Sequence, residues 1–279
     1  MNIVEAQSIE LKILCAVRDV CDKYGLIYYL GCGTLLGAVR HQGFIPWDDD
    51  IDILMPYTDY IQFLSIAQAE LSPEYFVQNA ETEENFYGAY TKIRMNNTTA
   101  MRKHHTKYHI HHGIWIDIFP LAPVESDFDW KFKKAIIKYS NLLQMDDYIR
   151  ANRKDFESDC GHTAVKLLDI LLTVPKSMRK ALHKFCLHLL TIHAAAAYVA
   201  EVWNTLGDRF PAKCFSGDAT YLTFENELFR VPSQYKEYLT IAYGDYMTPP
   251  PITERQGHGD LIFDTEHNYT YYMSQSADS

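Results

Sequence analysis

The spacing of apolar residues predicts that helices and short strands alternate in the first half of the chain. Between residues 4 and 24, apolar positions recur at helical spacing and charged residues such as Glu10 fall outside, so we expect an amphipathic helix that Gly25 ends. The pattern also predicts shorter helices over 35–41 and 57–70. Short apolar runs bounded by Gly, Pro or polar residues predict strands over 27–30, 51–55, 76–78, 91–95, 98–101 and 114–119, with Pro120 ending the last.

Longer helical patterns dominate the second half. They predict helices over 127–155, 165–174, 176–206 and 232–243, with Pro175 before the third and Pro232 at the first position of the fourth. We find no internal repeat and no low-complexity linker. The pattern therefore indicates an α+β protein in which helices flank a mixed sheet, with a mixed α/β half over 1–125 and a mostly helical half over 126–279.

Length and charge narrow the class of protein. The chain has 279 residues and a net charge of −10, which is enough length for a sizeable core and disfavours a nucleic-acid partner. Residues 131–190 differ, because they hold twelve Lys and Arg against six Asp and Glu. This basic segment is either a solvated set of helix faces or an amphipathic surface that rests on anionic lipid.

Cysteine spacing and hydropathy bear on the compartment. The six cysteines form no CxxC pair, the first residues contain no signal-like apolar region, and no 18-residue apolar stretch is free of charge. We therefore expect a cytoplasmic protein with reduced thiols, with peripheral contact at the inner face of the membrane as an extension of the lipid hypothesis.

The densest chemical signal is a group of four acids within five residues. Asp48 and Asp49 precede Asp50 and Asp52, and on a strand the last two point to one face while Ile51 points to the other. Two carboxylates on one strand face can share a hard divalent cation such as Mg²⁺. The alternative is an acidic surface turn, but the interleaved apolar residues favour burial and hence a metal site.

A third acid stands alone in a later apolar strand. Asp117 is either a buried carboxylate paired with Lys or Arg, or a third metal ligand that faces Asp50 and Asp52 from a neighbouring strand. The second arrangement is that of a one-metal or two-metal phosphoryl-transfer site.

A glycine-rich turn precedes the acids. We expect Gly31 and Gly33 to form a tight turn whose backbone N–H groups approach a phosphate, and Thr34 to cap the short helix that follows. Alone, such a turn is weak evidence. A turn, a helix and then a D-x-D strand about twenty residues on resembles the nucleotidyltransferase fold, and we expect its catalytic core within 1–125.

The longer runs resemble one family within that fold. GTLLGAVRHQGFIPWDDDIDI, the later WIDIFPL and FENELFRVPSQYKEYLTIAYGDYMTPPP are similar to the LicD family of phosphotransferases, which is related to fukutin, over about residues 10–260. Cys32 departs from the family pattern, where an acid or small residue is common. The resemblance implies that the C-terminal motif completes an active site built on the first half.

The family resemblance also implies a reaction. Members move a substituted phosphate from a CDP-activated donor, typically CDP-choline, to a hydroxyl of a teichoic-acid or lipopolysaccharide glycan that is often lipid-linked, and CMP is released. Some relatives move ribitol phosphate or glycerol phosphate instead. In this chain Asp50, Asp52 and Asp117 would hold Mg²⁺, or Mn²⁺ in its place, and one of these acids or Asp48 would take the acceptor proton.

Other side chains are candidates for donor binding, each with a plainer alternative. They are helix-end cations, strand cations that balance the acids, a loop-packing indole, or groups in the C-terminal segment. The candidates are Gly31, Gly33, Thr34, Arg40, His41, Trp47, Lys92, Arg94, Arg255 and His258.

Two further features bear on the ligand. Residues 104–112 hold five histidines, which we interpret as a polar loop near the site, with a zinc site as the alternative. A choline head would need an aromatic cage, and 14% of the residues are aromatic, but the sequence does not single out the cage.

Two competing functions remain open from the sequence. A nucleotidyltransferase that acts on a sugar or small molecule would release pyrophosphate rather than CMP. A choline or nucleotide sensor would bind without turnover, but a sensor has no need of three intact acids.

Overall fold

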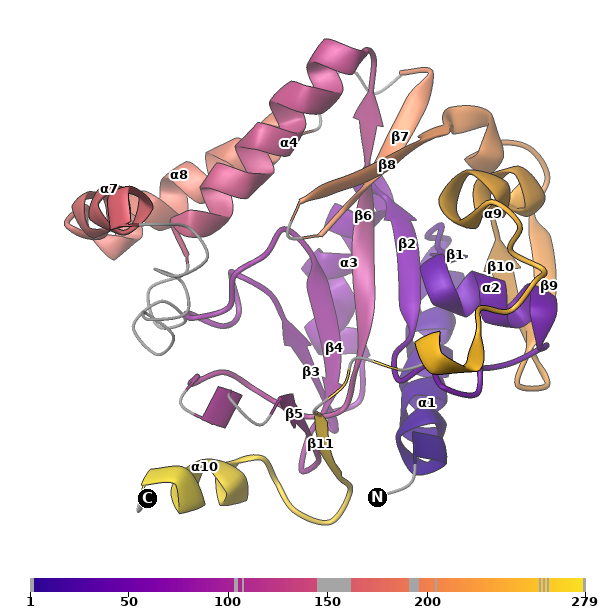
Figure 1. The fold of residues 1–279 in the computed structure, drawn as a ribbon, viewed down its shortest axis with the longest axis horizontal. Coiled ribbons are helices and arrows are strands. Elements are labelled where there is room, and N and C mark those ends of the chain that lie inside the picture. Colours follow the sequence, from indigo (N-terminus) through magenta and orange to yellow (C-terminus); the bar gives the residue numbers. More distant parts are fainter. Residues whose placement is uncertain are drawn as a thin grey trace.

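The computed structural model describes residues 3–102, 105–106, 108–144, 162–190, 196–203, 205–255, 257, 259 and 261–277. Its centre is a seven-stranded mixed sheet in which the long strand β6 (Trp115–Val124) lies in the middle (Figure 1). β6 runs parallel to β2 (Asp52–Pro56), and the other pairs in the sheet are antiparallel. The remaining strands are β1 (Tyr29–Leu30), β4 (Thr91–Met95), β3 (Tyr75–Gln78), β7 (Tyr198–Val202) and β8 (Leu206–Pro211).

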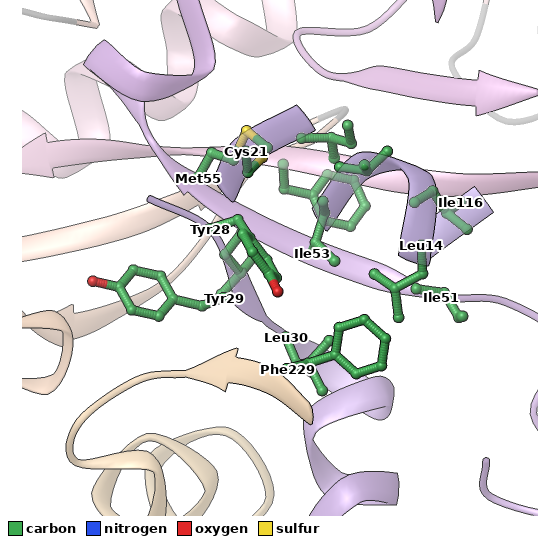
Figure 2. Close-up of a cluster of buried hydrophobic side chains, with 14 of the residues drawn as sticks. Leu14, Cys21, Tyr28, Tyr29, Leu30, Ile51, Ile53, Met55, Ile116 and Phe229 are labelled. Atoms are coloured by element: carbon green, nitrogen blue, oxygen red, sulfur yellow. The ribbon is translucent and has the colours of Figure 1, made fainter. Parts of the chain in front are cut away.

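One face of the sheet carries the main apolar core. Helices α1 (Ile3–Tyr24) and α3 (Tyr57–Glu70) pack on this face and touch each other. Leu14 of α1 meets Ile53 of β2 and Ile116 of β6 there (Figure 2). Asp52 directly precedes Ile53, and Asp117 directly follows Ile116. Because successive side chains on a strand point to opposite faces, both carboxylates point away from the core. The core therefore orients the acids.

Smaller elements lie beyond the β1 edge of the sheet and over its opposite face. Helix α2 (Cys32–Arg40) contacts β2, the hairpin strand β9 (Thr220–Phe224) and helix α9 (Tyr235–Tyr243). β9 pairs with β10 (Glu227–Val231), and β5 (Thr99–Arg102) pairs with β11 (Leu261–Asp264). The last elements are short helices at Ala212–Phe215, Ile252–Glu254 and α10 (Thr270–Ala277).

Three helices form a group at the upper left of Figure 1, beside the upper part of β6. They are α4 (Asp127–Leu142), α7 (His162–Leu172) and α8 (Lys176–Leu189). Ser126 caps α4, because its side chain accepts a hydrogen bond from the backbone N–H of Asp129. No helix in the described part of the chain is long and apolar enough to cross a bilayer.

Most of the expected elements of the first half are confirmed, and the α+β class is confirmed with them. Gly25, with a φ of 66°, directly follows α1 as predicted. Pro120, however, does not end β6. Asp117 donates its backbone N–H toward β2, so by alternation the missing N–H of Pro120 faces the other edge. At that edge β4 pairs with β6 only as far as Ile118, and β7 pairs with β6 from Leu121 onward. Pro120 therefore removes no hydrogen bond between strands.

The second half contains more strand than the pattern indicates. The predicted 176–206 helix ends at Leu189, and β7 and β8 follow it. β7 pairs with the distant residues 121–124 of β6, a long-range contact that overrides the weak local preference of an alanine-rich run. The last predicted helix begins at Tyr235 rather than Pro232, and α4 ends at Leu142, with residues 145–155 outside the described part. The division at residue 125 stays a prediction, although the sheet itself extends past it.

Candidate active site

Three carboxylates meet on the face of the sheet opposite the core. Asp52 and Asp117 are direct partners in the parallel pairing of β2 and β6, and Asp50 lies just before β2. One carboxylate oxygen from each of the three lies within 4.8 Å of the others. This donor set of hard oxygens is of the kind that Mg²⁺ binds. The expected convergence of these three acids is therefore present.

Electrostatic crowding marks the same group. Burial raises the pKa of the Asp52 carboxyl well above its usual value, and the charges of Asp50 and Asp117 raise it further. Asp48, Asp49 and Asp50 form a second close group of carboxylates along the loop. A bound cation would relieve this repulsion, so the residues fit a divalent ion.

Asp117 combines the two roles that its sequence left open. It faces the other two acids, and it also accepts hydrogen bonds from Lys92 Nζ at 2.6 and 2.8 Å and from Trp115 Nε1 at 2.8 Å. Burial lowers the pKa of Lys92, while the adjacent carboxylate opposes that shift. Lys92 is therefore placed to balance the acids, and it also lines the cavity beside them.

Arg94 lies two residues after Lys92 on β4, and hydrogen bonds to other parts of the protein hold its guanidinium. Its Nε donates to Gln78 Oε1 at 2.5 Å and its Nη1 to the carbonyl of Gly113 at 2.6 Å. The guanidinium lies 5.0 Å from the Trp115 ring centroid, and burial lowers its pKa to about 10. Arg94 thus supports the indole that contacts Asp117.

The glycine-rich segment is a helix start rather than a turn. Gly31 is the N-cap position, and α2 already begins at Cys32, whose φ is 44°. Thr34 therefore lies inside the helix and does not cap it. Its hydroxyl accepts a hydrogen bond from the backbone N–H of Asp52 at 2.8 Å, which ties α2 to the acidic strand.

The two glycines allow close approach of neighbouring side chains. A Cβ on Gly31 would lie 2.5 Å from Leu54 Cγ, and one on Gly33 would lie 2.6 Å from Asp48 Oδ2. Gly33 thus admits the Asp48 carboxylate against the first turn of α2. This contact is the reason that the structure gives for a glycine at this position.

Sequence reasoning missed a network that holds the start of α2. The hydroxyl of Tyr238 on α9 accepts a hydrogen bond from the Cys32 N–H at 3.1 Å and donates one to Glu201 on β7. Burial raises the pKa of Glu201 to about 7. No local signal marks Glu201, because its surroundings read as a helix. Tyr238 falls in the C-terminal run that resembles the LicD family.

Glu10 is a correction to the predicted helix face. It is fully buried on α1, and neither carboxylate oxygen has a hydrogen-bond partner in the structure. Gln7, three residues earlier on the same face, donates to the carbonyl of Asp48 at 2.8 Å. Burial raises the pKa of Glu10, and the charges of the acidic loop add to the shift. α1 therefore backs the acidic loop with a carboxyl group, where the pattern indicated a solvent-facing residue.

Another set of candidates gathers on the far side of the acidic loop. Arg40 donates to the Tyr246 carbonyl at 3.0 Å, and the Arg255 guanidinium lies 4.9 Å from the Trp47 ring centroid. His41 packs edge-on against Trp47 at 6.2 Å. These four do not line the cavity described next, whereas His258 falls outside the described residues.

A cavity of about 710 Å³ opens over the acids. Asp50, Asp52 and Asp117 line it together with Lys92 and Arg94. Its other walls are mainly aromatic, with acidic groups toward β7 and β8 and basic groups toward β5. These include Phe86, Tyr87, Tyr90, Tyr108, Trp115, Phe119, Trp203, Phe210, Tyr238, Tyr243, Glu201, Asp208, Arg102 and His105.

The histidine-rich segment is built into the wall. His111 stacks on Phe76 at 5.2 Å, and the His112 ring nitrogen hydrogen-bonds to the Tyr108 carbonyl at 2.8 Å. Burial lowers the pKa of each imidazole to about 3. Within the described ranges, the groups close enough to hold a metal consist of aspartates, and His104 lies outside them.

A mixed sheet that presents carboxylates from adjacent parallel strands beneath the start of a short helix defines a nucleotidyltransferase-like domain. Residues 25–147 match the family model described as LicD/FKTN/FKRP, nucleotidyltransferase domain. The chain thus carries a LicD-family domain, as its motifs indicate, and the family places it among transferases that act on phosphate groups.

Curated relatives extend the match. The chain is 29% identical over 274 residues to the lipopolysaccharide cholinephosphotransferase LicD of Haemophilus influenzae, which covers 92% of this chain and 96% of that protein. Shorter matches of 42% over 66 residues and 48% over 49 residues link it to uncharacterized proteins of Rickettsia typhi and Rickettsia prowazekii. Each of these covers less than a quarter of both chains.

Proposed function

We propose that the protein transfers phosphocholine from CDP-choline to a hydroxyl of a cell-surface glycan, either lipopolysaccharide or teichoic acid, and releases CMP. The observation that carries this proposal is the trio of carboxylates at the floor of a largely aromatic cavity. The Haemophilus relative is named as a lipopolysaccharide cholinephosphotransferase, which supports choline phosphate and lipopolysaccharide as the substrate classes.

In this proposal Asp50, Asp52 and Asp117 hold a Mg²⁺ ion, or Mn²⁺ in its place. When bound, the ion would neutralise the donor diphosphate. The acceptor oxygen forms a bond to the choline-bearing phosphorus while the bond from that phosphorus to the CMP oxygen breaks. The acceptor proton passes to one of these carboxylates or to Asp48. Lys92 and Trp115 hold the Asp117 carboxylate in position for this step.

A donor panel tests the proposal directly. CDP-choline, CDP-ribitol and CDP-glycerol are offered with candidate glycans, and CMP release is measured with and without EDTA. We expect release to be fastest with CDP-choline, to stop with EDTA and to return with Mg²⁺. Preference for either alditol donor would move the function to alditol-phosphate transfer. Pyrophosphate release from CTP would indicate a nucleotidyltransferase, and tight binding without turnover would indicate a sensor.

We further propose that the protein contacts an anionic membrane, where a lipid-linked acceptor would lie. Helix α4 supports this proposal because it turns aromatic side chains to solvent. Phe128 and Phe132 stack on its outer face and are 80% and 50% exposed, and Tyr139 is exposed on the same stripe. Its inner face buries Ile137 together with Lys133 and Asn141.

Helix α8, which packs against α4, also exposes apolar side chains. Buried Arg179 donates to the Leu143 carbonyl at 2.8 Å, and buried His183 hydrogen-bonds to the Ser140 carbonyl at 3.1 Å. The outer face of α8 exposes Met178, Leu182 and Phe185. Polar contacts thus contribute to the packing of the pair, and apolar side chains of both helices are turned to solvent.

Charge on these helices favours anionic lipid as the partner. Lys131, Lys134 and Lys138 lie along the exposed surface of α4, and Lys184 on that of α8. Exposed aromatics beside lysines are the composition of an interfacial helix.

Vesicle sedimentation tests the membrane proposal. We expect binding to phosphatidylglycerol vesicles and little binding to phosphatidylcholine vesicles. The double variant Phe128→Ser/Phe132→Ser should lose most of the binding, and Tyr221→Ser, which alters an exposed aromatic on β9, should not. Unchanged binding of the double variant would contradict the proposal. A wild-type dimer that this variant converts to monomer would reassign the surface to self-association.

A further inference from the structure

The pairing of β6 with β7 shows how far Glu201 lies from the acidic trio (Asp50, Asp52 and Asp117) along the sheet. On β6, Phe119 follows Asp117 by two residues and points to the same face, and Leu121 follows by four. Leu121 is the direct partner of Glu201 on β7. At about 3.3 Å per residue, Glu201 therefore lies at a level about 13 Å along β6 from Asp117. Asp117 and Glu201 both line the cavity.

Aromatic rings cover the sheet between these two levels. Phe119 lies 5.3 Å from the ring of Tyr90, just before β4, and 6.2 Å from the ring of Trp203, just after β7, centroid to centroid. All three rings line the cavity, and Trp203 remains 44% exposed. A cation that rests here would lie against aromatic rings on the path from the acidic trio to Glu201.

Charge gives the cavity a direction. Glu201 and Asp208 lie at the end formed by β7 and β8. Arg102 and His105 lie at the other end, near β5, which Figure 1 places at the opposite end of β6. A cationic group is stabilised near the first pair and repelled near the second, while a phosphate or nucleotide has the reverse preference.

Resting on the proposed function, we infer that Glu201 and the ring floor of Phe119, Tyr90 and Trp203 form the subsite for the quaternary ammonium of choline. The cytidine part of the donor then extends toward Arg102. Choline's two-carbon chain is shorter than this interval, so a phosphate at the acidic trio places the ammonium over the rings, on the side that faces Glu201. Tyr238 orients the Glu201 carboxylate through its hydroxyl hydrogen bond.

A donor that lacks the positive charge of choline distinguishes ammonium binding by Glu201 from a purely structural role of this residue. CDP-choline is compared with CDP-3,3-dimethylbutanol, in which carbon replaces the ammonium nitrogen and the shape is kept. We expect Glu201→Gln to lower kcat/KM for CDP-choline by about tenfold or more, mainly through KM, and to change the neutral donor by less than about threefold. An equal loss with both donors would show that Glu201 is structural and overturn the inference.

Two further variants keep the test decisive. Tyr238→Phe removes the hydroxyl that orients the carboxylate, so we expect it to weaken CDP-choline more than the neutral donor, but by less than Glu201→Gln does. Trp203→Leu alters a half-exposed ring and should selectively weaken CDP-choline even if Glu201→Gln fails to fold. If Trp203→Leu leaves the ratio of the two donors unchanged, the ring floor does not bind the ammonium. If the wild type uses neither donor but turns over CDP-ribitol, the proposed function itself fails.

Discussion

Asp52 and Asp117 are direct partners across the only parallel strand pair of the described sheet. A one-residue slip between β2 and β6 would turn one of these carboxylates into the apolar core, so the register of that pair assembles the acidic site. The apolar partners Ile53 and Ile118, which face the core, hold the register. Catalytic geometry and core packing therefore depend on the same pairing.

Replacing Asp52 should separate activity from stability. Asp52→Asn removes a buried carboxylate whose raised pKa reflects burial and repulsion from Asp50 and Asp117. We expect transfer to fall by about 10³-fold or more, equivalent to about 4 kcal/mol, while the melting temperature at pH 8 stays equal or rises. Kinetics and thermal melts check both, with exposed Asp218→Asn as the matched control. Near-normal turnover would remove Asp52 from the metal set.

Replacing Lys92 should have the opposite effect on stability. Lys92→Met leaves the buried Asp117 carboxylate without its ammonium partner, so we expect a loss of about 3–5 kcal/mol in urea unfolding without metal. Mg²⁺ should recover part of this loss, because a cation would replace the missing charge. Lys213→Met breaks an exposed pair with Glu237 and should leave the unfolding midpoint close to that of the wild type. A Lys92→Met protein as stable as the wild type would show that the pair has no stabilising role.

Tyr238→Phe tests the network at the start of α2. The change leaves the Cys32 N–H and the Glu201 carboxyl without the hydroxyl between them, and we expect a loss of about 1–3 kcal/mol together with slower transfer. Tyr235→Phe on the same helix, where the ring is only partly buried, serves as the control and should cost about 0.5 kcal/mol or less. Equal stability of the two variants would mean that water replaces the hydroxyl without cost.

The buried imidazoles should make the protein sensitive to mild acid. The pKa values of His111 and His112 fall to about 3, whereas unfolded histidine titrates near 6.5. As the pH falls through that window, the unfolded chain binds protons that the folded chain does not. Each group therefore removes up to about 1.4 kcal/mol of stability per pH unit. Urea midpoints between pH 7.5 and 4.5 measure the slope, and His111→Gln should flatten it. An unchanged slope in that variant would show that His111 already titrates normally.

Local sequence patterns identified the acids because their positions follow from simple rules. Alternation on a strand puts Asp50 and Asp52 on one face, and the apolar run around Asp117 predicts its own strand. The turn before α2 was harder, because Thr34 looks like a helix cap and only the tertiary contact to the Asp52 N–H shows its actual partner.

The residues that the pattern missed owe their positions to distant contacts. Glu10 is charged on a helix and looks solvent-facing, but the acidic loop packs over that face. Glu201 lies in a run with a helical appearance, and its strand exists because β6 offers an unpaired edge 80 residues earlier at Leu121. Such positions require the pairing of the whole sheet, which no short window of sequence contains.

The long strand β6 has a consequence for biosynthesis. Its first part pairs with β4, which is already made, but residues 121–124 wait for β7, which leaves the ribosome only after the intervening helices. During that interval an apolar strand edge is open at the centre of the sheet. The central sheet is therefore completed only after β7 has been made, and a fragment that ends after β6 should aggregate through this open edge.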